Sequence, residues 1–94
     1  MSDRHRALSQ PQRVPLGVAR KGFRGQIDAI AAHNAPSGIP PAELERRLLE
    51  LGFVEGAKIE ILHEGLVGRD PIAVRVNHST IALRRREAMA ILVS

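Results

Sequence analysis

The segment from Glu43 to Leu62 joins a helix to a strand with very little chain between them. Leu44, Leu48 and Leu51 recur at the i, i+4 and i+7 spacing that places one apolar stripe along a helix. A helix with a single apolar face must be covered by another element, and the alternating strand that follows it supplies one. The segment therefore predicts a small domain in which one short helix closes over a sheet.

The ends of this helix are marked by residues with clear stereochemical roles. Pro41 suits the first helical turn, where the missing N–H costs no hydrogen bond. Gly52 follows Leu51 directly, at the position where a left-handed residue ends many helices. Phe53 comes one residue later and is placed to contact Leu48, as in a Schellman motif. We expect the helix to end at Leu51.

Strands are predicted wherever apolar residues alternate with polar ones. Their ranges are 26–32, with Ile27, Ala29 and Ala31 on one face, then 57–63, 72–76, a returning strand through Ile81 and Leu83, and 90–93. The glycines and the Asp-Pro pair in residues 64–71 predict a long hairpin loop. Asn77-His78 is expected to form a two-residue turn, and residues 86–88 a single helical turn. The fold class expected is mainly β: a small SH3-like barrel of about five strands, with one short helix inserted after the first strand.

Length and charge divide the chain into two unequal parts. Ninety-four residues are enough for one domain, which we expect to span residues 14–94. Residues 1–13 are polar and lack periodicity, so we expect a flexible basic tail. The first 25 residues carry a net charge of +5, whereas the remaining residues carry eight basic and nine acidic groups. The pI of about 11.0 thus reflects the N-terminal part more than the body of the domain.

Cellular location is inferred from what the sequence lacks. It contains no cysteine, which excludes disulfides, a thiolate nucleophile and a zinc ribbon. No apolar run is long enough to span a bilayer, and residues 1–13 show no secretory signal. We expect a cytoplasmic protein.

No catalytic constellation is visible, and an enzyme is not expected. The four histidines include no pair at metal-ligand spacing, and no serine lies in a G-x-S-x-G context. His63 and Glu64 with Asp70 make at most a weak metal site, because the glycine-containing segment between them implies no fixed geometry. No metal site and no cofactor are therefore predicted.

Arg84-Arg85-Arg86 is the one concentrated charge within the body of the domain. Such a run can dock an acidic protein or a phosphate backbone, but the more common reason for one is a solvated strand end, here partly balanced by Glu87. Stacking aromatics for single-stranded nucleic acid are missing, because neither Phe23 nor Phe53 lies in a suitable motif.

Taken together, the segments RRLLELGFVEGAKIEIL and DPIAVRVNHSTIALRRREAMAILV resemble the FeoA family, the small cytosolic component of bacterial ferrous-iron uptake. The resemblance covers residues 14–93. It is carried by the Leu51-Gly52-Phe53 helix end, Gly56 before the strand, Pro71-Ile72, Leu83-Arg84 and the Glu87-Ala88 turn.

This resemblance implies an SH3-like barrel that binds FeoB, the membrane ferrous-iron permease with a cytosolic GTP-binding domain, and modulates iron uptake. The partner-interface candidates are Arg47, Leu51, Gly52, Phe53, Arg84 and Arg85, with the three arginines expected to be exposed. A nucleic-acid-associated SH3-like module remains an alternative, although nucleic acid is not the expected partner. A second alternative is an interaction domain related to the C-terminal domain of iron-dependent repressors. A homo-oligomer is also compatible with the sequence, since small barrels keep partly open edges.

Overall fold

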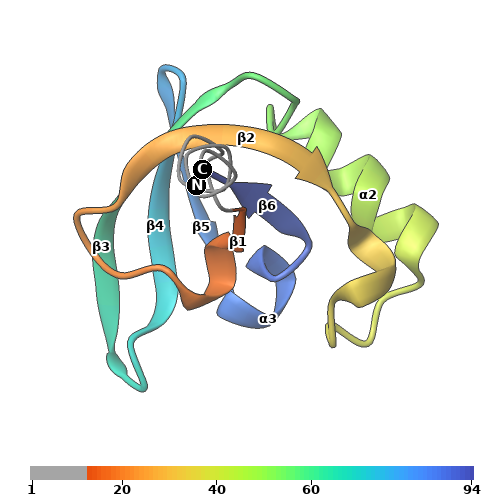
Figure 1. Ribbon diagram of the computed structural model, residues 1–94. Coiled ribbons are helices and arrows are strands. Elements are labelled where there is room, and N and C mark those ends of the chain that lie inside the picture. The colour runs from red at the N-terminus through yellow and green to blue at the C-terminus, as the bar shows by residue number, and fades with distance from the viewer. Residues whose placement is uncertain (1–12) are drawn as a thin grey trace, which may run out of the picture.

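A computed structural model describes residues 13–94 (Figure 1). The flexible tail expected for residues 1–13 lies, apart from Arg13, outside the described residues. The strands are β1 (Val14–Pro15), β2 (Arg24–Ile30), β3 (Lys58–Val67), β4 (Asp70–Val76), β5 (Ser79–Leu83) and β6 (Ile91–Val93). The helices are the 3₁₀ turns η1 (Leu16–Val18) and η2 (Ala32–Asn34) and the α-helices α2 (Pro41–Glu50) and α3 (Arg85–Ala88).

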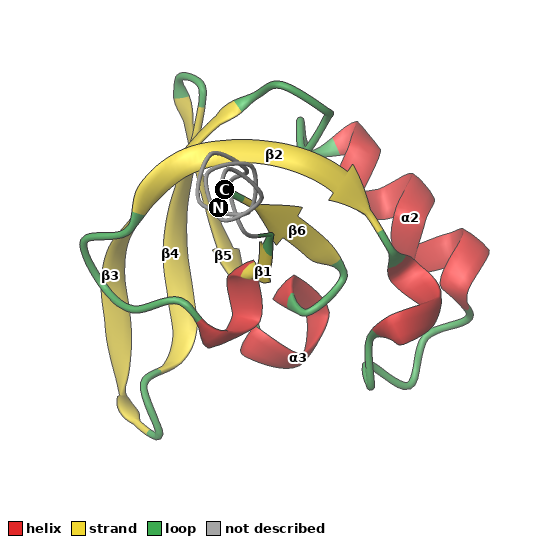
Figure 2. Cartoon of the chain, viewed as in Figure 1, coloured by secondary structure: helices red, strands yellow, loops and turns green. Residues whose placement is uncertain are grey.

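All six strands form one antiparallel sheet in the order β1-β6-β2-β3-β4-β5. Strand β2 bends the sheet, because its first half pairs with β3 and its second half with β6 (Figure 2). The fold is mainly β and SH3-like, as predicted. The strand beyond the expected five is β1, whose two residues are too few to show any alternation. Helix α2 consequently follows the second strand of the chain.

Strand β2 corrects the prediction for residues 26–32. It covers Arg24–Ile30, and its register against β6 shifts between Ile27 and Ala29. The extra residue in this bulge changes which side chains face inward. Ile27 and Ala32 are buried and Ile30 packs against the core, whereas a strict alternation would have turned Ala29 and Ala31 inward.

The long hairpin loop predicted for residues 64–71 is wrong. Strand β3 continues to Val67, and only Gly68 and Arg69 separate it from β4. Both turn residues have positive φ, +67° and +58°, as a two-residue hairpin turn of type I′ requires. Gly65 lies within β3 at a register shift, where the Asp70 carbonyl comes so close that a Cβ would clash. Glycine here marks a bulge in a strand and not a loop.

The rest of the chain follows the sequence pattern closely. Asn77 and His78 form the two-residue β4–β5 turn, with Asn77 at a φ of +53°. The single helical turn is α3, and the closing strand is β6.

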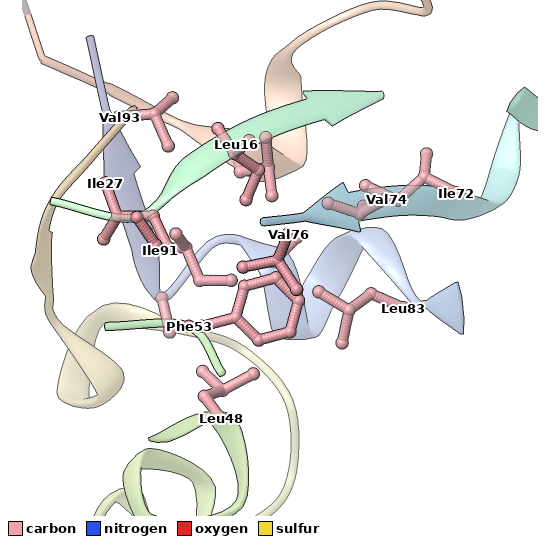
Figure 3. Close-up of a cluster of buried hydrophobic side chains, with 14 of the residues drawn as sticks. Leu16, Ile27, Leu48, Phe53, Ile72, Val74, Val76, Leu83, Ile91 and Val93 are labelled. Atoms are coloured by element: carbon pink, nitrogen blue, oxygen red, sulfur yellow. The ribbon is translucent and has the colours of Figure 1, made fainter. Parts of the chain in front are cut away.

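The core consists of aliphatic side chains around one phenylalanine (Figure 3). Phe53 is fully buried, and its ring lies among side chains from α2, β4, β5 and β6. The leucine stripe of α2 contributes Leu44 and Leu48, and η1 contributes Leu16. The helix therefore covers an open side of the bent sheet, as its amphipathic pattern predicts.

Candidate functional site

The C-terminal end of α2 has the geometry of a Schellman motif. Gly52 adopts a φ of +104°, its N–H donates to the Leu49 carbonyl over 3.0 Å, and the Phe53 N–H donates to the Leu48 carbonyl over 2.9 Å. The predicted stop after Leu51 is confirmed. Because these bonds fix the backbone, the direction of the Leu51 side chain is fixed as well.

The three candidates at this helix end lie at different depths. Phe53 is in the core, so it holds the helix end in place and offers no surface to a partner. Gly52 is partly buried above Val76. Leu51 is 39% exposed, and Leu49 and Val54 beside it are 42% and 41% exposed. The end of α2 thus presents apolar side chains on a rigid backbone.

Two of the candidate arginines lie near one carboxylate. The Arg47 guanidinium is 3.9 Å from the Glu87 carboxylate, and the Arg84 N–H donates to the same carboxylate over 3.4 Å. Arg47 also lies one helical turn before Leu51, on the same face of α2. We call Arg47, Leu51, Arg84 and Glu87 the α2–α3 surface. It combines a partly exposed apolar side chain with two exposed arginines, of which Arg47 faces the Glu87 carboxylate with its guanidinium and Arg84 bonds it through the backbone N–H.

Arg85 does not have the exposure expected of it. Its side chain is only 17% exposed and donates to the carbonyl oxygens of Gly17, Ala19 and Arg69 and to the Glu64 carboxylate over 2.6–3.1 Å. Its own N–H donates to the Asp70 carboxylate over 2.9 Å. The arginine run therefore divides: Arg84 and Arg86 are exposed, whereas Arg85 joins parts of the fold.

Glu64 is the acidic centre of these contacts. The Lys21 N–H donates to its carboxylate over 3.0 Å, and this hydrogen bond, together with the charges of Arg85, Arg20 and Arg69, lowers the pKa of Glu64 against a smaller opposing effect of burial. Arg85 and Glu64 are 21 residues apart, and no spacing rule in the sequence links them. The charge of each residue is evident from its type, but nothing in the sequence indicates that the two side chains pair.

The same contacts bear on the weak metal site considered for His63, Glu64 and Asp70. The Glu64 carboxylate accepts a hydrogen bond from the Arg85 guanidinium, and the Asp70 carboxylate accepts one from the Arg85 backbone N–H, so both carboxylates already have donors. Within residues 13–94 no group of three or more His, Asp or Glu side chains is arranged to hold a metal ion.

A groove of about 760 Å³ lies on the outward face of β2, β3 and β4. Arg24, Lys58 and Arg75 line it together with Glu60, which is 3.8 Å from Arg75. These charged groups are ordinary on a solvated sheet face. Ser94 also lines the groove, but the lining holds no histidine that could act as its base. Neither of the described α-helices has the length and apolar character needed to cross a membrane.

Comparison with known proteins gives a consistent result. The FeoA domain family matches residues 14–94. FeoA from Chlorobium tepidum is 35% identical over 85% of this chain and 68% of its own, with a TM-score of 0.67. FeoA from Stenotrophomonas maltophilia, an SH3 domain protein solved with zinc, is 29% identical over 84% of this chain and 87% of its own, with a TM-score of 0.66.

The fold also occurs inside larger proteins. A manganese-dependent transcriptional repressor is 23% identical over 89% of this chain but only 42% of its own, with a TM-score of 0.69. That likeness concerns the fold alone. No curated protein sequence matches the chain.

Proposed function

This chain belongs to the FeoA family, a non-catalytic accessory family associated with ferrous-iron transport, and we propose that it regulates iron uptake by binding a FeoB-type permease. The proposed contact is with the cytosolic GTP-binding part of that permease. The α2–α3 surface carries the proposal, because it is a rigid apolar and basic surface at a helix end.

The composition of this surface suits a protein partner. Interfaces are typically organised around a buried apolar anchor with arginine at or near it. Leu51 can serve as the anchor, since its side chain is exposed while its backbone is fixed by the Schellman hydrogen bonds. Little conformational entropy is then lost when a partner covers it.

The charges favour an acidic surface on the partner. The Glu87 carboxylate lies 3.9 Å from the Arg47 guanidinium and bonds only the backbone N–H of Arg84, so the exposed Arg84 side chain keeps its positive charge for a partner. Arg86 adds a further exposed guanidinium group on α3, whereas the exposed Arg46 of α2 is balanced by Glu43, Glu45 and Glu50 of the same helix. Complementary charge of this kind raises the association rate more than the final affinity, and its effect falls with salt.

The test is binding to the isolated cytosolic domain of the permease, measured by surface plasmon resonance or calorimetry. Leu51→Asp is expected to weaken binding by about tenfold or more, because a charge would replace the anchor. Arg84→Glu is expected to slow association at low salt, with a smaller effect at high salt. Arg24→Glu is the matched control: it makes the same charge change on an exposed residue of β2 and should leave binding unchanged.

Two results would contradict the proposal. One is no binding of the unmodified chain at low salt, where charge contacts are strongest. The other is unchanged binding by Leu51→Asp when thermal unfolding shows that the variant is as stable as the unmodified chain.

A further inference from the structure

Exposed apolar side chains also gather at a second place, separate from the end of α2. Six large apolar side chains are exposed among the described residues, and three of them stand out: Leu66 at 103%, Val67 at 86% and Val18 at 57%. Leu66 and Val67 lie at the end of the β3–β4 hairpin, and Val18 ends η1. The other three are 39–42% exposed and belong to the end of α2.

Arg85 connects η1 with the hairpin turn. Its guanidinium donates hydrogen bonds to the Gly17 and Ala19 carbonyls, on either side of Val18. It also donates one to the Arg69 carbonyl in the hairpin turn. Val18 and the hairpin turn are therefore held around one side chain. We call Val18, Arg20, Lys21, Leu66, Val67 and Arg69 the hairpin surface.

The end of this hairpin projects from the domain. It extends past η1 and α3 and lies far from α2 (Figure 1). The two-residue turn of Gly68 and Arg69, both at positive φ, keeps it compact. A protruding apolar end has no pocket of its own to fill, and its shape suits insertion into a deformable interface.

Positive charge surrounds these apolar residues. Arg20, Lys21 and Arg69 are exposed. The Arg20 guanidinium is 3.8 Å from the Glu64 carboxylate, which also accepts hydrogen bonds from the Lys21 backbone N–H and the Arg85 guanidinium, and the Asp70 carboxylate accepts one from the Arg85 backbone N–H. Basic residues behind an apolar tip are the arrangement that binds anionic lipid headgroups while the tip enters the boundary with the acyl chains.

We propose that the hairpin surface binds the anionic lipid surface of a membrane, with Leu66 and Val67 inserted at the headgroup boundary. Arg20, Lys21 and Arg69 contact the headgroups in this arrangement. The proposal does not depend on the permease, because the contact is with lipid.

The chain contains no tryptophan, so an introduced one reports on its own position. Leu66→Trp is added to vesicles of phosphatidylglycerol mixed with phosphatidylethanolamine, and to vesicles of phosphatidylcholine alone. The expected result is a blue shift of the emission with the anionic vesicles only. Leu49→Trp, placed on exposed α2, is the matched control and should show no shift.

Sedimentation with the same vesicles tests the native residues. The double variant Leu66→Ser, Val67→Ser is expected to lower the partition coefficient at least about tenfold, because two apolar side chains no longer enter the interface. Leu49→Ser, Val54→Ser is the matched control, since both side chains are exposed and lie outside the α2–α3 surface, and it should partition like the unmodified chain. Both hairpin residues are almost fully exposed, so the double variant should keep its folding stability.

Three results would overturn the proposal. The first is no partition into anionic vesicles at low salt, and the second is equal partition of the unmodified chain and the hairpin variant, which would assign lipid binding to other residues. The third is that the hairpin variant loses affinity for the isolated permease domain, or loses self-association in light scattering, while its lipid partition is unchanged. The hairpin would then dock on a protein.

Discussion

Glu64 accepts hydrogen bonds from two parts of the chain that are distant in sequence, the Lys21 backbone and the Arg85 side chain. Each contact favours the charged carboxylate, so the pKa of Glu64 in the folded protein lies below its value in the unfolded chain, about 4.3. A carboxylate with a lowered pKa stabilises the fold above the unfolded pKa, and this contribution is lost as the pH falls through the folded value. The contribution of Glu64 is therefore present at neutral pH and lost in acid.

Glu64→Gln is expected to unfold at a lower temperature than the unmodified chain at pH 7, because it removes the charge that these donors face. The difference should shrink as the pH falls through the lowered pKa of the native carboxylate, because Glu64 is then protonated and uncharged as well. Thermal unfolding followed by circular dichroism at pH 7 and pH 3 measures both effects. Glu55→Gln, on an exposed residue between α2 and β3, is the control. A difference between Glu64→Gln and the unmodified chain that is the same at both pH values would show that the charge of Glu64 is not what matters.

At the scale of the elements, helix α3 is joined by side-chain contacts to α2, to η1 and to the β3–β4 turn. It has four residues, too few to be stable alone. On one side Glu87 reaches Arg47 of α2, and on the other Arg85 reaches η1 and the hairpin turn. The short helix thus joins the two surfaces described above, and Arg85 makes most of the contacts on the hairpin side.

The neighbouring residues Arg85 and Arg86 allow a direct test of this role. Arg85→Met is expected to lower the free energy of unfolding by about 3 kcal/mol, because three carbonyl groups and the Glu64 carboxylate lose a charged donor. Arg86→Met makes the same chemical change on an exposed side chain and should change stability by less than about 0.5 kcal/mol. Urea unfolding of both variants measures the difference. Equal effects would mean that Arg85 does not hold these elements together.

What the sequence could predict depends on how far apart the interacting residues are. The stop of α2 depends on Leu48, Gly52 and Phe53, which are close together in the chain, and it was predicted correctly. The β2 bulge and the full length of β3 depend on pairing with strands many residues away, and both were missed. Gly65 looked like a loop residue because nothing in its neighbours shows that Asp70 will approach it.

The candidate site divides in the same way. The burial of Phe53 follows from the Schellman geometry, which is local. The helix period placed Leu51 in the buried stripe with Leu44 and Leu48, and this was wrong: Leu51 follows the last helical residue and its side chain is 39% exposed. Arg84, Arg85 and Arg86 look alike in the sequence, and only their distant partners distinguish them. The apolar hairpin end was also missed, since Leu66 and Val67 fell within the range expected to be a loop.

At the scale of the whole molecule, exposed apolar side chains occur at two separate places, the C-terminal end of α2 and the end of the β3–β4 hairpin. These two ends lie far apart in Figure 1. A single rigid domain can therefore touch a membrane with one surface and a protein held in that membrane with the other. Each contact raises the effective concentration for the second, because the domain no longer has to find its partner from bulk solution. Two weak contacts can in this way give a stable association.

This arrangement predicts how the two sets of substitutions combine. In anionic vesicles that contain the permease, the unmodified chain should bind more tightly than it binds the isolated permease domain. Leu66→Ser, Val67→Ser should remove this gain and leave the affinity for the isolated domain unchanged, whereas Leu51→Asp should weaken binding in both settings. The two surfaces share no residue. When Leu51→Asp is combined with Leu66→Ser, Val67→Ser, the changes in binding free energy should therefore add to within about 0.5 kcal/mol. Vesicles of phosphatidylcholine with the same permease are the control and should show no gain; a gain of equal size there would mean that anionic lipid takes no part in holding the domain at the membrane.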